Sequence, residues 1–478
     1  MASLFLIAAC PVEADVQQRP VDSAEPSRDF AVSLSLAEVD GLTLAALSSV
    51  ELNFEAEVAI QVVDPSGTSR RTAYTAAGRR HSIPVVGLRA DTAYQLRALA
   101  RDGDGAYHAS EWTGWSTGAL PDALLDADFA IGTASESDEG VTLFAPSPLY
   151  GSPQLPYVVG IDGEGEVVYY YDDPELYDVD ETNRQVRAQD DGMIGLLLPE
   201  GFRAFDVLGR TRLAVSKPDV HHDALLMPSG NVLALAYDDH EVTDELTGET
   251  SIVRGDVVVE ISPENETVWS WAAYDHLDTD RMGEYTEDFE TAGFLDWTHA
   301  NALDYDPDTD RIMISLRNQS WLAMVDHATG ELLSRMGPGG DYALQGGDWF
   351  HLQHGASVVD GGVTVFDNGY DDAYHSRAIH YLVDERGLTA TEAWVYDVGF
   401  YARTMGDVDL LPDGSYLVTA GASDPAATAD DRRGFYRIGP DGATLWSAWL
   451  THSSMFEVFR ADRTYWLFEL DEIEAAVP

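Results

Sequence analysis

One stretch of the chain gathers histidines and an arginine in positions that suit anion chemistry. Between Asp296 and Gly369 two Asp-Trp turns each lead to histidine, the first to His299 and the second to His351 and His354. Each turn is followed by an acidic or glycine-rich turn and an apolar strand, and Arg317 closes the first of these strands. An arginine among histidines at loop–strand junctions predicts an active site that handles an anion. The alternative is a set of structural histidines that cap strands.

Segments made of a turn and a strand repeat after Pro121. They read MPSGNVLALAYDD, DPDTDRIMISLRN, VVDGGVTVFDNG and LPDGSYLVTAGAS, and the last three begin 52 or 53 residues apart. Repeats of this length that contain only strands and turns predict the blades of a β-propeller. About 355 residues at this period predict six blades, with seven as the alternative. The late segment FEVFRADRTYWLFEL is expected to close the ring by joining the first blade.

The repeats also place three histidines at equivalent positions. His222, His299 and His354 each precede the turn of their own repeat. Equivalent positions in successive blades converge on the central channel, so these side chains are predicted to face one another across the axis. His221 leaves the first position uncertain by one residue, because alternation along a strand points only one of the pair inward. His351 is the runner-up to His354 and is better explained as a structural residue.

The overall fold class predicted is all-β, with a small domain before the propeller. Residues 29–120 alternate in short strands and predict a β-sandwich, and LRADTAYQLRALARD resembles a fibronectin III-like module, with Tyr94 in the core. Residues 1–28 are expected to form a lipoprotein-type signal and a disordered tether. Residues 121–478 are then the β-propeller catalytic domain.

Composition excludes several classes of partner and site. The chain has 83 acidic and 28 basic residues and a net charge of −55, which argues against nucleic acid and anionic membranes as partners. The single cysteine, Cys10, excludes an intramolecular disulfide and a cysteine-ligated metal site. The start MASLFLIAAC, followed by a polar tether, resembles a bacterial lipoprotein signal. We therefore expect an exported, periplasmic or cell-surface lipoprotein with a lipid anchor at Cys10; the alternative is a chance resemblance.

Several motifs in fixed order resemble one family. HHDALLMPSGNVLAL, DWTHANALDYDPDTDRIMISLRNQS, QHGASVVDGGVTVFDNG and the late FRADR are together similar to the bacterial arylsulfotransferases, which use an aryl sulfate as donor. The resemblance implies a six-bladed propeller, a phenolic acceptor and no cofactor, and the preceding sandwich fits the architecture of the family. Some members have a cysteine pair that this chain lacks. A homodimer is a further expectation.

The resemblance assigns roles to individual residues. His354 matches the histidine that becomes transiently sulfated, and Arg317 matches the arginine of the following strand. His299 and Asn301 match the site residues of the His-Ala-Asn motif, and His222 matches the first active-site histidine. Asn301 is expected to bind an oxygen or orient a histidine, and His221 is grouped with it as substrate-binding.

The same residues suit sulfuryl transfer on chemical grounds. A neutral imidazole of His354 can attack sulfur and form a covalent intermediate, which divides one difficult step into two. Arg317 supplies planar, permanently charged donors for the sulfuryl oxygens. His299 and His222 are placed to protonate the departing phenolate and then to deprotonate the acceptor phenol. Which of these two histidines is the acid and base stays open.

Other signals are weaker, and two other functions compete. The run DYDPDTDR lacks key positions of a calcium loop and predicts an ordinary acidic turn, and no metal site is expected. Trp297, Trp349, Phe350 and Tyr374 could wall an aryl pocket, but core packing is at least as good an explanation. The competing functions are a calcium-dependent propeller hydrolase of the lactonase or phosphoesterase type and a non-catalytic ligand-binding propeller lipoprotein.

Overall fold

The computed structural model describes most of the chain after the N-terminal tether. The described residues are 30–125, 129–133, 140–148, 158–172, 185–189, 192–198, 200–243, 248, 250–278, 293–370, 375–421, 433–450 and 456–469. Almost all regular structure in these ranges is β-strand, as the sequence predicts. No helix in the described part is long and apolar enough to cross a membrane. Cys10 lies outside the described residues, so the lipid anchor stays a prediction, as does the homodimer.

The N-terminal domain is built around one long strand, β2 (Leu42–Val63). The first part of β2 pairs with β1 and β4, and its second part pairs with β3 and β5, which in turn pairs with β6 and β7. The bounds are β1 (Val32–Val39), β3 (Ser69–Arg71), β4 (Gly78–Val85), β5 (Ala93–Asp102), β6 (Tyr107–Ala109) and β7 (Thr113–Ser116). Tyr94 is buried in the core between them. Its hydroxyl accepts a hydrogen bond from the backbone N–H of Arg89 at 2.9 Å. The strands of this domain pair in one continuous sheet. The predicted β-sandwich and its likeness to fibronectin III modules stay predictions; we keep the word sandwich as a label for this domain.

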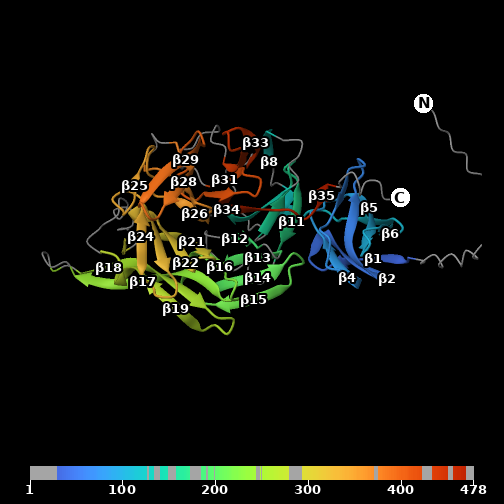
Figure 1. Ribbon diagram of the computed structural model, residues 1–478, viewed down its shortest axis with the longest axis horizontal. Coiled ribbons are helices and arrows are strands. Elements are labelled where there is room, and N and C mark those ends of the chain that lie inside the picture. Colours follow the sequence, from blue (N-terminus) through green and yellow to red (C-terminus); the bar gives the residue numbers. More distant parts are fainter. Residues whose placement is uncertain are drawn as a thin grey trace, which may run out of the picture.

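The second domain is a ring of six antiparallel sheets, which confirms the predicted six-bladed propeller (Figure 1). We name each blade by its innermost strand. From the inside outward, the first three blades are β34 (Phe456–Thr464), β9 (Val141–Pro148), β10 (Val158–Ile161) and β11 (Val167–Tyr171); β12 (Val186–Ala188), β13 (Met193–Leu198), β14 (Gly201–Asp206) and β15 (Thr211–Ser216); and β16 (Val220–Leu226), β17 (Val232–Thr243), β18 (Thr250–Ile261) and β19 (Thr267–Ala272).

The other three blades follow the same order. They are β21 (Ala300–Asp306), β22 (Arg311–Leu316), β23 (Trp321–Asp326) and β24 (Leu332–Met336); β26 (His354–Val359), β27 (Gly362–Asp367), β28 (Arg377–Asp384) and β29 (Thr389–Asp397); and β30 (Asp407–Leu410), β31 (Tyr416–Ala420), β32 (Gly434–Ile438) and β33 (Thr444–Leu450). Short extra strands extend three blades: β8 (Phe129–Thr133) pairs with β33, β20 (Leu295–Asp296) with β18, and β25 (Ala343–Leu344) with β29. The remaining short elements are α1 (Asp122–Leu125) and the 3-10 helices η2 (Ala273–Asp275) and η4 (Arg317–Gln319).

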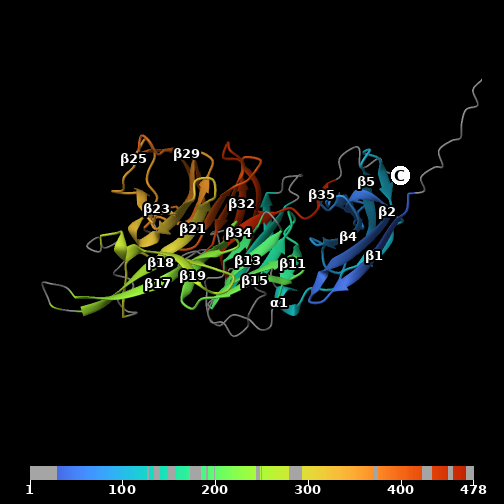
Figure 2. The same cartoon turned by 60° about the horizontal axis from the view of Figure 1, so that its bottom comes forward.

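The ring is closed by the end of the chain. Strand β34 lies within the segment predicted to close the ring, and it pairs with β9 as the innermost strand of the first blade. The chain then continues to β35 (Phe468–Glu469), which pairs with β3 of the sandwich. The range assigned to the propeller therefore also supplies one strand to the N-terminal domain. Figure 2 shows this last segment running from the propeller to the sandwich.

The two domains share apolar and charged contacts. Leu42 and Ala45 of β2 belong to the same buried cluster as Tyr169 and Tyr171 of β11. Arg89 of the sandwich donates to Asp162 of the first blade, at 2.6 Å from Nη2 and 2.8 Å from Nε. Together with the pairing of β35, these contacts fix the sandwich to one side of the ring.

Four of the six innermost strands bulge near one end. Pairing with the next strand shifts between Val220 and Ala224, between Ala300 and Ala302, between His354 and Ser357, and between Val458 and Ala461. A bulge leaves residues out of the ladder and re-aims their side chains. All the predicted site positions on innermost strands lie in or beside these bulges.

The closing strands supply the first testable prediction. A chain that ends at residue 455 lacks β34 and β35, so the first blade loses its innermost strand and the sandwich loses an edge strand. We expect this variant to lose cooperative thermal unfolding, because both domains are left with unpaired edges. A chain that ends at Glu469 keeps both strands and is the control. Cooperative unfolding of the shorter chain, at the control's midpoint by circular dichroism, would show that β34 does not hold the ring.

Candidate active site

The predicted histidines and arginine come together at one end of the central channel. His222 lies at the start of β16, His299 directly precedes β21, and His354 begins β26. The ring centroids of His222 and His299 are 4.8 Å apart. The Phe459 ring of β34 lies 5.8 Å from that of His222 and 6.1 Å from that of His354, edge to face in both cases. Three blades thus deliver imidazoles to one small volume, with Phe459 against two of them.

His354 is held as a neutral ring with a defined tautomer. Burial first, and then the positive charge of Arg317, lower its pKa well below the usual value, and hydrogen bonds to Asn368 and Leu352 oppose this only in part. Its Nδ1 lies 2.7 Å from Oδ1 of Asn368. The amide nitrogen of Asn368 donates to the carbonyls of Ala402 and Met405 at 2.7 and 2.8 Å, so its orientation is assigned by these partners. Nδ1 of His354 is therefore the donor, and Nε2 keeps its lone pair.

His299 has a carboxylate partner. Its Nδ1 lies 2.5 Å from Oδ2 of Asp296, which is buried. Its side chain is 19% exposed, whereas those of His222 and His354 are buried. His299 adopts a left-handed backbone conformation, with φ of 46°, which turns its side chain out of the regular strand direction. The most open histidine of the group is thus the one that pairs directly with an acid.

The adjacent residues His221 and His222 both belong to the network, and it is His222 that contacts the rings of His299 and Phe459. The left-handed φ of His222, 56°, and the surrounding bulge set the direction of its side chain. Their Nδ1 atoms are 2.8 Å apart, so one N–H lies between the rings. His221 stacks on Tyr237, and its Nε2 lies 3.0 Å from Asp256. His221 therefore lies between Asp256 and His222 and supports the His222 ring.

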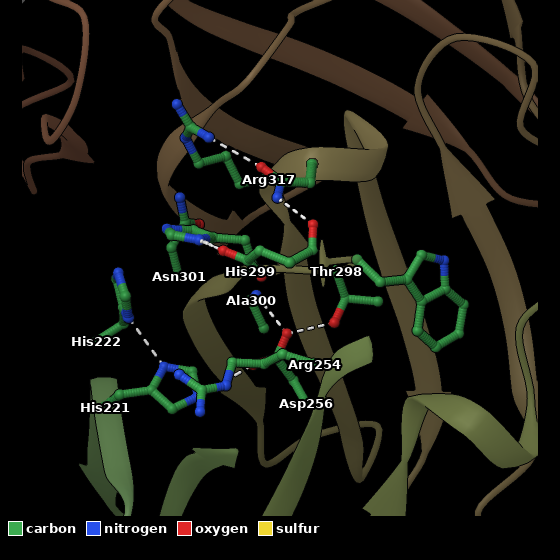
Figure 3. A network of polar contacts seen from close by, with 12 residues as sticks. His221, His222, Arg254, Asp256, Thr298, His299, Ala300, Asn301 and Arg317 are labelled. Atoms are coloured by element: carbon green, nitrogen blue, oxygen red, sulfur yellow. Dashed lines mark hydrogen bonds and ion pairs between the residues drawn. The ribbon is translucent and has the colours of Figure 1, made fainter. Parts of the chain in front are cut away.

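Asp256 organises the turn that carries His299 (Figure 3). One of its oxygens accepts hydrogen bonds from the Thr298 hydroxyl at 2.5 Å and from the Ala300 N–H at 2.6 Å. Burial alone raises the pKa of this carboxyl, but the hydrogen bonds from His221, Thr298 and Ala300 outweigh burial, and its pKa lies below the usual value. A single buried carboxylate therefore ties His221 to the His-Ala-Asn turn.

The Arg-Asn-Gln-Ser segment orients Arg317 and forms hydrogen bonds with the loops that lead to His299 and His354. Arg317 is buried, and its Nη1 donates to Oδ1 of Asn318 at 2.9 Å. The side-chain amides of Asn318 and Gln319 donate to the carbonyls of Asp296 and Trp297 at 2.8 and 2.6 Å. The hydroxyl of Ser320 accepts from the N–H of Leu352, in the loop that leads to His354. Arg317 is the residue that this segment presents to the histidines, and its charge lowers the pKa of both His222 and His354.

Asn301 and Gln353 join the β21 and β26 blades behind the histidines. The amide of Asn301 donates to the Gln353 carbonyl at 2.7 Å, which fixes the backbone next to His354. The amide of Gln353 donates to the Ser315 hydroxyl and to the Trp321 carbonyl at 3.0 and 3.1 Å. Oδ1 of Asn301 is buried and has no hydrogen-bond partner within the described part of the chain. Asn301 therefore fixes the backbone of the loop that leads to His354.

A second polar cluster lies further along the same innermost strands. Arg187 donates to Asp223 at 2.8 Å and to the Leu303 carbonyl at 2.7 Å, and Arg460 lies 3.3 Å from the same carboxylate. Asp407, Asp409 and Asp462 form a group whose oxygens lie within 4.8 Å of one another. Burial, together with the charges of Asp407 and Asp462, raises the pKa of Asp409 well above its usual value. Burial likewise raises the pKa of Asp462 to about 6.

The structure places the other predicted residues away from the histidines. Trp297 and Phe350 are fully buried in inter-blade cores, and Trp349 packs against the same core as Phe350. Tyr374 lies outside the described residues. His351 makes an edge contact with Tyr370, its ring centroid 4.8 Å away.

The acidic turn is an ordinary one. Asp306 uses both oxygens within the turn, on the N–H of Asp308 and on the hydroxyl of Thr309. Both oxygens of this carboxylate therefore have hydrogen-bond donors within the turn.

Several site residues were missed from the sequence. Asp296, Asn368 and Phe459 each lie within a quoted motif. Asn368 is 14 residues from its partner His354, and Phe459 contacts His222 from the other end of the chain. Asp296 is only three residues from its partner His299, and that spacing is a signal that could have found it. Asp256 lies in the middle of a strand of a longer blade and carries no signal of its own.

Comparison with known proteins decides the family. The sequence profile of the Arylsulfotransferase (ASST) family matches residues 134–441, which is more than half of the chain. The chain belongs to the arylsulfotransferase family. The matched range holds His222, His299, Arg317 and His354, and membership supports a sulfotransferase-type enzyme. A search of curated protein sequences finds no matching relative of this arylsulfotransferase-family chain.

Solved structures resemble the chain only distantly. A Bacteroides caccae protein of unknown function is 11% identical with a TM-score of 0.44, covering 68% of this chain and 98% of its own. The Pseudomonas aeruginosa periplasmic gluconolactonase is 12% identical with a TM-score of 0.37, covering 68% and 99%. An auxiliary nutrient binding protein from Bacteroides ovatus is 9% identical with a TM-score of 0.36, covering 87% and 94%. Likeness at this level carries no argument about what the arylsulfotransferase-family chain does.

The raised pKa of Asp462 predicts how stability depends on pH. With a pKa of about 6 in the fold and an ordinary value of 3.8 when unfolded, Asp462 ionises first in the unfolded chain, so stability falls as pH rises from about 4 to about 6. Asp462→Asn mimics the protonated form and should be more stable than wild type at pH 7. The gain should vanish near pH 4. Urea unfolding at both pH values checks this, and an equal effect at both would contradict it.

Proposed function

We propose that the protein transfers a sulfuryl group from a phenolic sulfate ester to a phenolic acceptor through a sulfohistidine on His354. The single observation that carries the proposal is the environment of this ring, which is buried, neutral and hydrogen-bonded at Nδ1, so that Nε2 is an available nucleophile. Membership of the arylsulfotransferase family supports the donor and acceptor classes.

The proposed reaction is ping-pong. In the first half-reaction Nε2 of His354 attacks sulfur, the S–O bond to the aryl group breaks, and the phenol leaves. In the second, the oxygen of an acceptor phenol attacks the same sulfur, the N–S bond breaks, and its electron pair returns to Nε2. Asn368 holds the Nδ1 proton throughout, so the ring presents the same nitrogen in both directions.

Charge stabilisation in this scheme comes from Arg317. By analogy with phosphoryl transfer, sulfuryl transfer has a loose transition state in which negative charge is spread over three equatorial oxygens. Such a transition state is stabilised mainly by hydrogen-bond donors held in the right positions. Arg317 is buried and oriented by Asn318, so its guanidinium is organised before substrate arrives. The His222 ring lies close to that of His299 on the same side of the cluster.

The calcium-dependent hydrolase receives less support. Such an enzyme needs oxygen ligands at the catalytic end of the channel, where this protein carries imidazoles and a guanidinium. Within the described part of the chain, the carboxylates that lie close enough to hold a metal are Asp407, Asp409 and Asp462. Two arginines lie among the same buried carboxylates, and Arg460 contacts Asp407 at 3.6 Å.

A direct assay tests the proposed function. Wild-type protein should release 4-nitrophenol from 4-nitrophenyl sulfate faster when phenol is added, with phenyl sulfate as the second product. Without acceptor, the protein should retain one SO₃ group on His354, detected by mass spectrometry of the rapidly quenched enzyme. His354→Ala should lose both signals, whereas His351→Ala, which changes a nearby ring outside the histidine cluster, should keep them. Hydrolysis without transfer would point to a sulfatase, and no release from folded protein would favour the ligand-binding alternative.

A second variant examines the planar geometry of Arg317. Arg317→Lys keeps the positive charge but loses the fork of donors, so we expect kcat to fall roughly 10²–10³-fold, the size of effect seen when one donor to a developing charge is removed. The free energy of unfolding, measured in urea, should be reported beside kcat to separate misfolding from lost chemistry. If the lysine variant has the kcat of the wild type, the planar donors of Arg317 are not needed for the reaction.

A further inference from the structure

We infer that the protein binds one small, neutral phenol in a cavity between two neighbouring blades, separately from the histidine cluster. The cavity has a volume of about 250 Å³ and lies between the β21 and β26 blades. Strand β26 begins at His354 and ends at Val359, which lines the cavity, and these residues are roughly 16 Å apart along the strand. The inference goes beyond the proposed function and does not depend on it.

Methionine side chains form one wall of the cavity. Met313 of β22 is paired directly with Met324 of β23. Met336 of β24 is paired with Leu322, which lies two residues from Met324 and therefore on the same face of the blade. All four side chains line the cavity. Thioethers are polarizable and make favourable contacts with aromatic rings, so this wall favours an aromatic ligand over an aliphatic one of the same size.

The opposite wall carries short side chains, which leaves the space unfilled. It consists of valines of the β26 blade and of the turn residues Gly361 and Gly362. Elsewhere in the same buried cluster, the rings of Phe350 and Tyr381 fill the space. In other proteins an apolar cavity of about 150 Å³ is large enough to bind benzene, and pockets for drug-sized ligands have about 300–1,000 Å³. A cavity of about 250 Å³ therefore suits one substituted aromatic ring.

Two hydroxyl groups in the lining suit the oxygen of a phenol. The hydroxyls of Ser334 and Tyr342 are 3.3 Å apart, and either can be the donor. Only one of their two hydrogens can lie between them, and each oxygen can also accept a hydrogen bond. A ligand with one hydroxyl group can therefore donate or accept at this point while its ring contacts the methionines.

The charges at the cavity select against anions. Nη1 of Arg311 lies 2.7 and 2.8 Å from the two oxygens of Glu385, so this ion pair joins the two blades and its charges cancel. Asp306 adds a negative charge to the lining, and the whole chain carries a net charge of −55. A phenol is neutral at pH 7, because such hydroxyls ionise near pH 10. Aryl sulfates and sulfonates are anions, so the cavity should admit phenols and exclude these esters and acids.

Methionine methyl NMR of the full chain tests the inference. With isotope-labelled methyl groups, assigned by replacing each methionine with leucine in turn, phenol should cause saturable shifts at Met313, Met324 and Met336. We expect a Kd on the order of 0.1–1 mM, as for other one-ring ligands. Met405 packs against Phe459 beside the histidines and therefore reports binding in the channel separately.

Benzenesulfonate is the matched control ligand, because it is an anion with the same ring and is not an ester. It should leave the three cavity methionines unshifted. The inference is overturned if phenol shifts only Met405, if it shifts none of the cavity methionines, or if benzenesulfonate shifts them as strongly as phenol does.

Two phenylalanine substitutions on strand β28 separate the cavity from its surroundings. Val383 lines the cavity, so Val383→Phe should fill the space and abolish the saturable shifts with phenol. The neighbouring Leu382 is 48% exposed and points to the other face of the strand, so Leu382→Phe adds a ring outside the cavity and should leave the Kd unchanged. Unchanged phenol binding by Val383→Phe would show that the ligand lies elsewhere and would overturn the inference.

A charge variant examines why the ligand must be neutral. Glu385→Gln keeps the shape of the side chain and removes the carboxylate that neutralises Arg311. We expect benzenesulfonate to shift the cavity methionines of this variant at concentrations that leave the wild type unshifted. Continued exclusion of benzenesulfonate would overturn selection by charge. Absence of sulfuryl transfer, with saturable cavity shifts, would instead reject the proposed function and keep this site.

Discussion

The central constraint on this molecule is that a propeller brings its innermost strands together around a narrow channel. Contacts between these strands run from β16 through β21, β26, β30 and β34 to β12, so side chains at one level of the channel share one volume. Three imidazoles and a guanidinium occupy that volume here. Such a group is tolerable only if the rings are mostly neutral, and the lowered pKa values of His222 and His354 are the direct result of burial beside Arg317.

Polar side chains behind the site donate hydrogen bonds to backbone carbonyls. Asn301, Asn318, Gln319 and Gln353 are all buried, and each donates its amide to a carbonyl of another loop or strand. Buried amides are expensive unless satisfied, so each bond strongly disfavours any other arrangement of the loops it joins. The side chains of His299, Arg317 and His354 are thereby fixed relative to one another, which is what the proposed catalysis by charge stabilisation requires.

The sequence predicts the architecture and the side chains that meet in the channel, but it does not predict the residues that support those side chains. The repeat length and the turn residues predict the number of blades. The equivalent positions of His222, His299 and His354 in their repeats predict that these side chains converge. A bulge and a left-handed residue at His222 break the period of two, and it is His222 that contacts the rings of His299 and Phe459. Asp256 and Asn368 could not be found in this way, since their importance lies in contacts between strands and loops that no local pattern encodes. The aromatic residues of the Asp-Trp turns were core, because a turn between blades must itself be anchored.

The pairing of β34 and β35 with strands from the beginning of each domain has a consequence for how the chain comes to be folded. Domains of a growing chain usually fold in order as they leave the ribosome. Here the first blade lacks its innermost strand, and the N-terminal domain keeps an open edge at β3, until β34 and β35 have been made. Neither domain is complete before that point, although most of each has already been synthesised. Shielding the exposed strand edges in the meantime therefore becomes part of folding this protein.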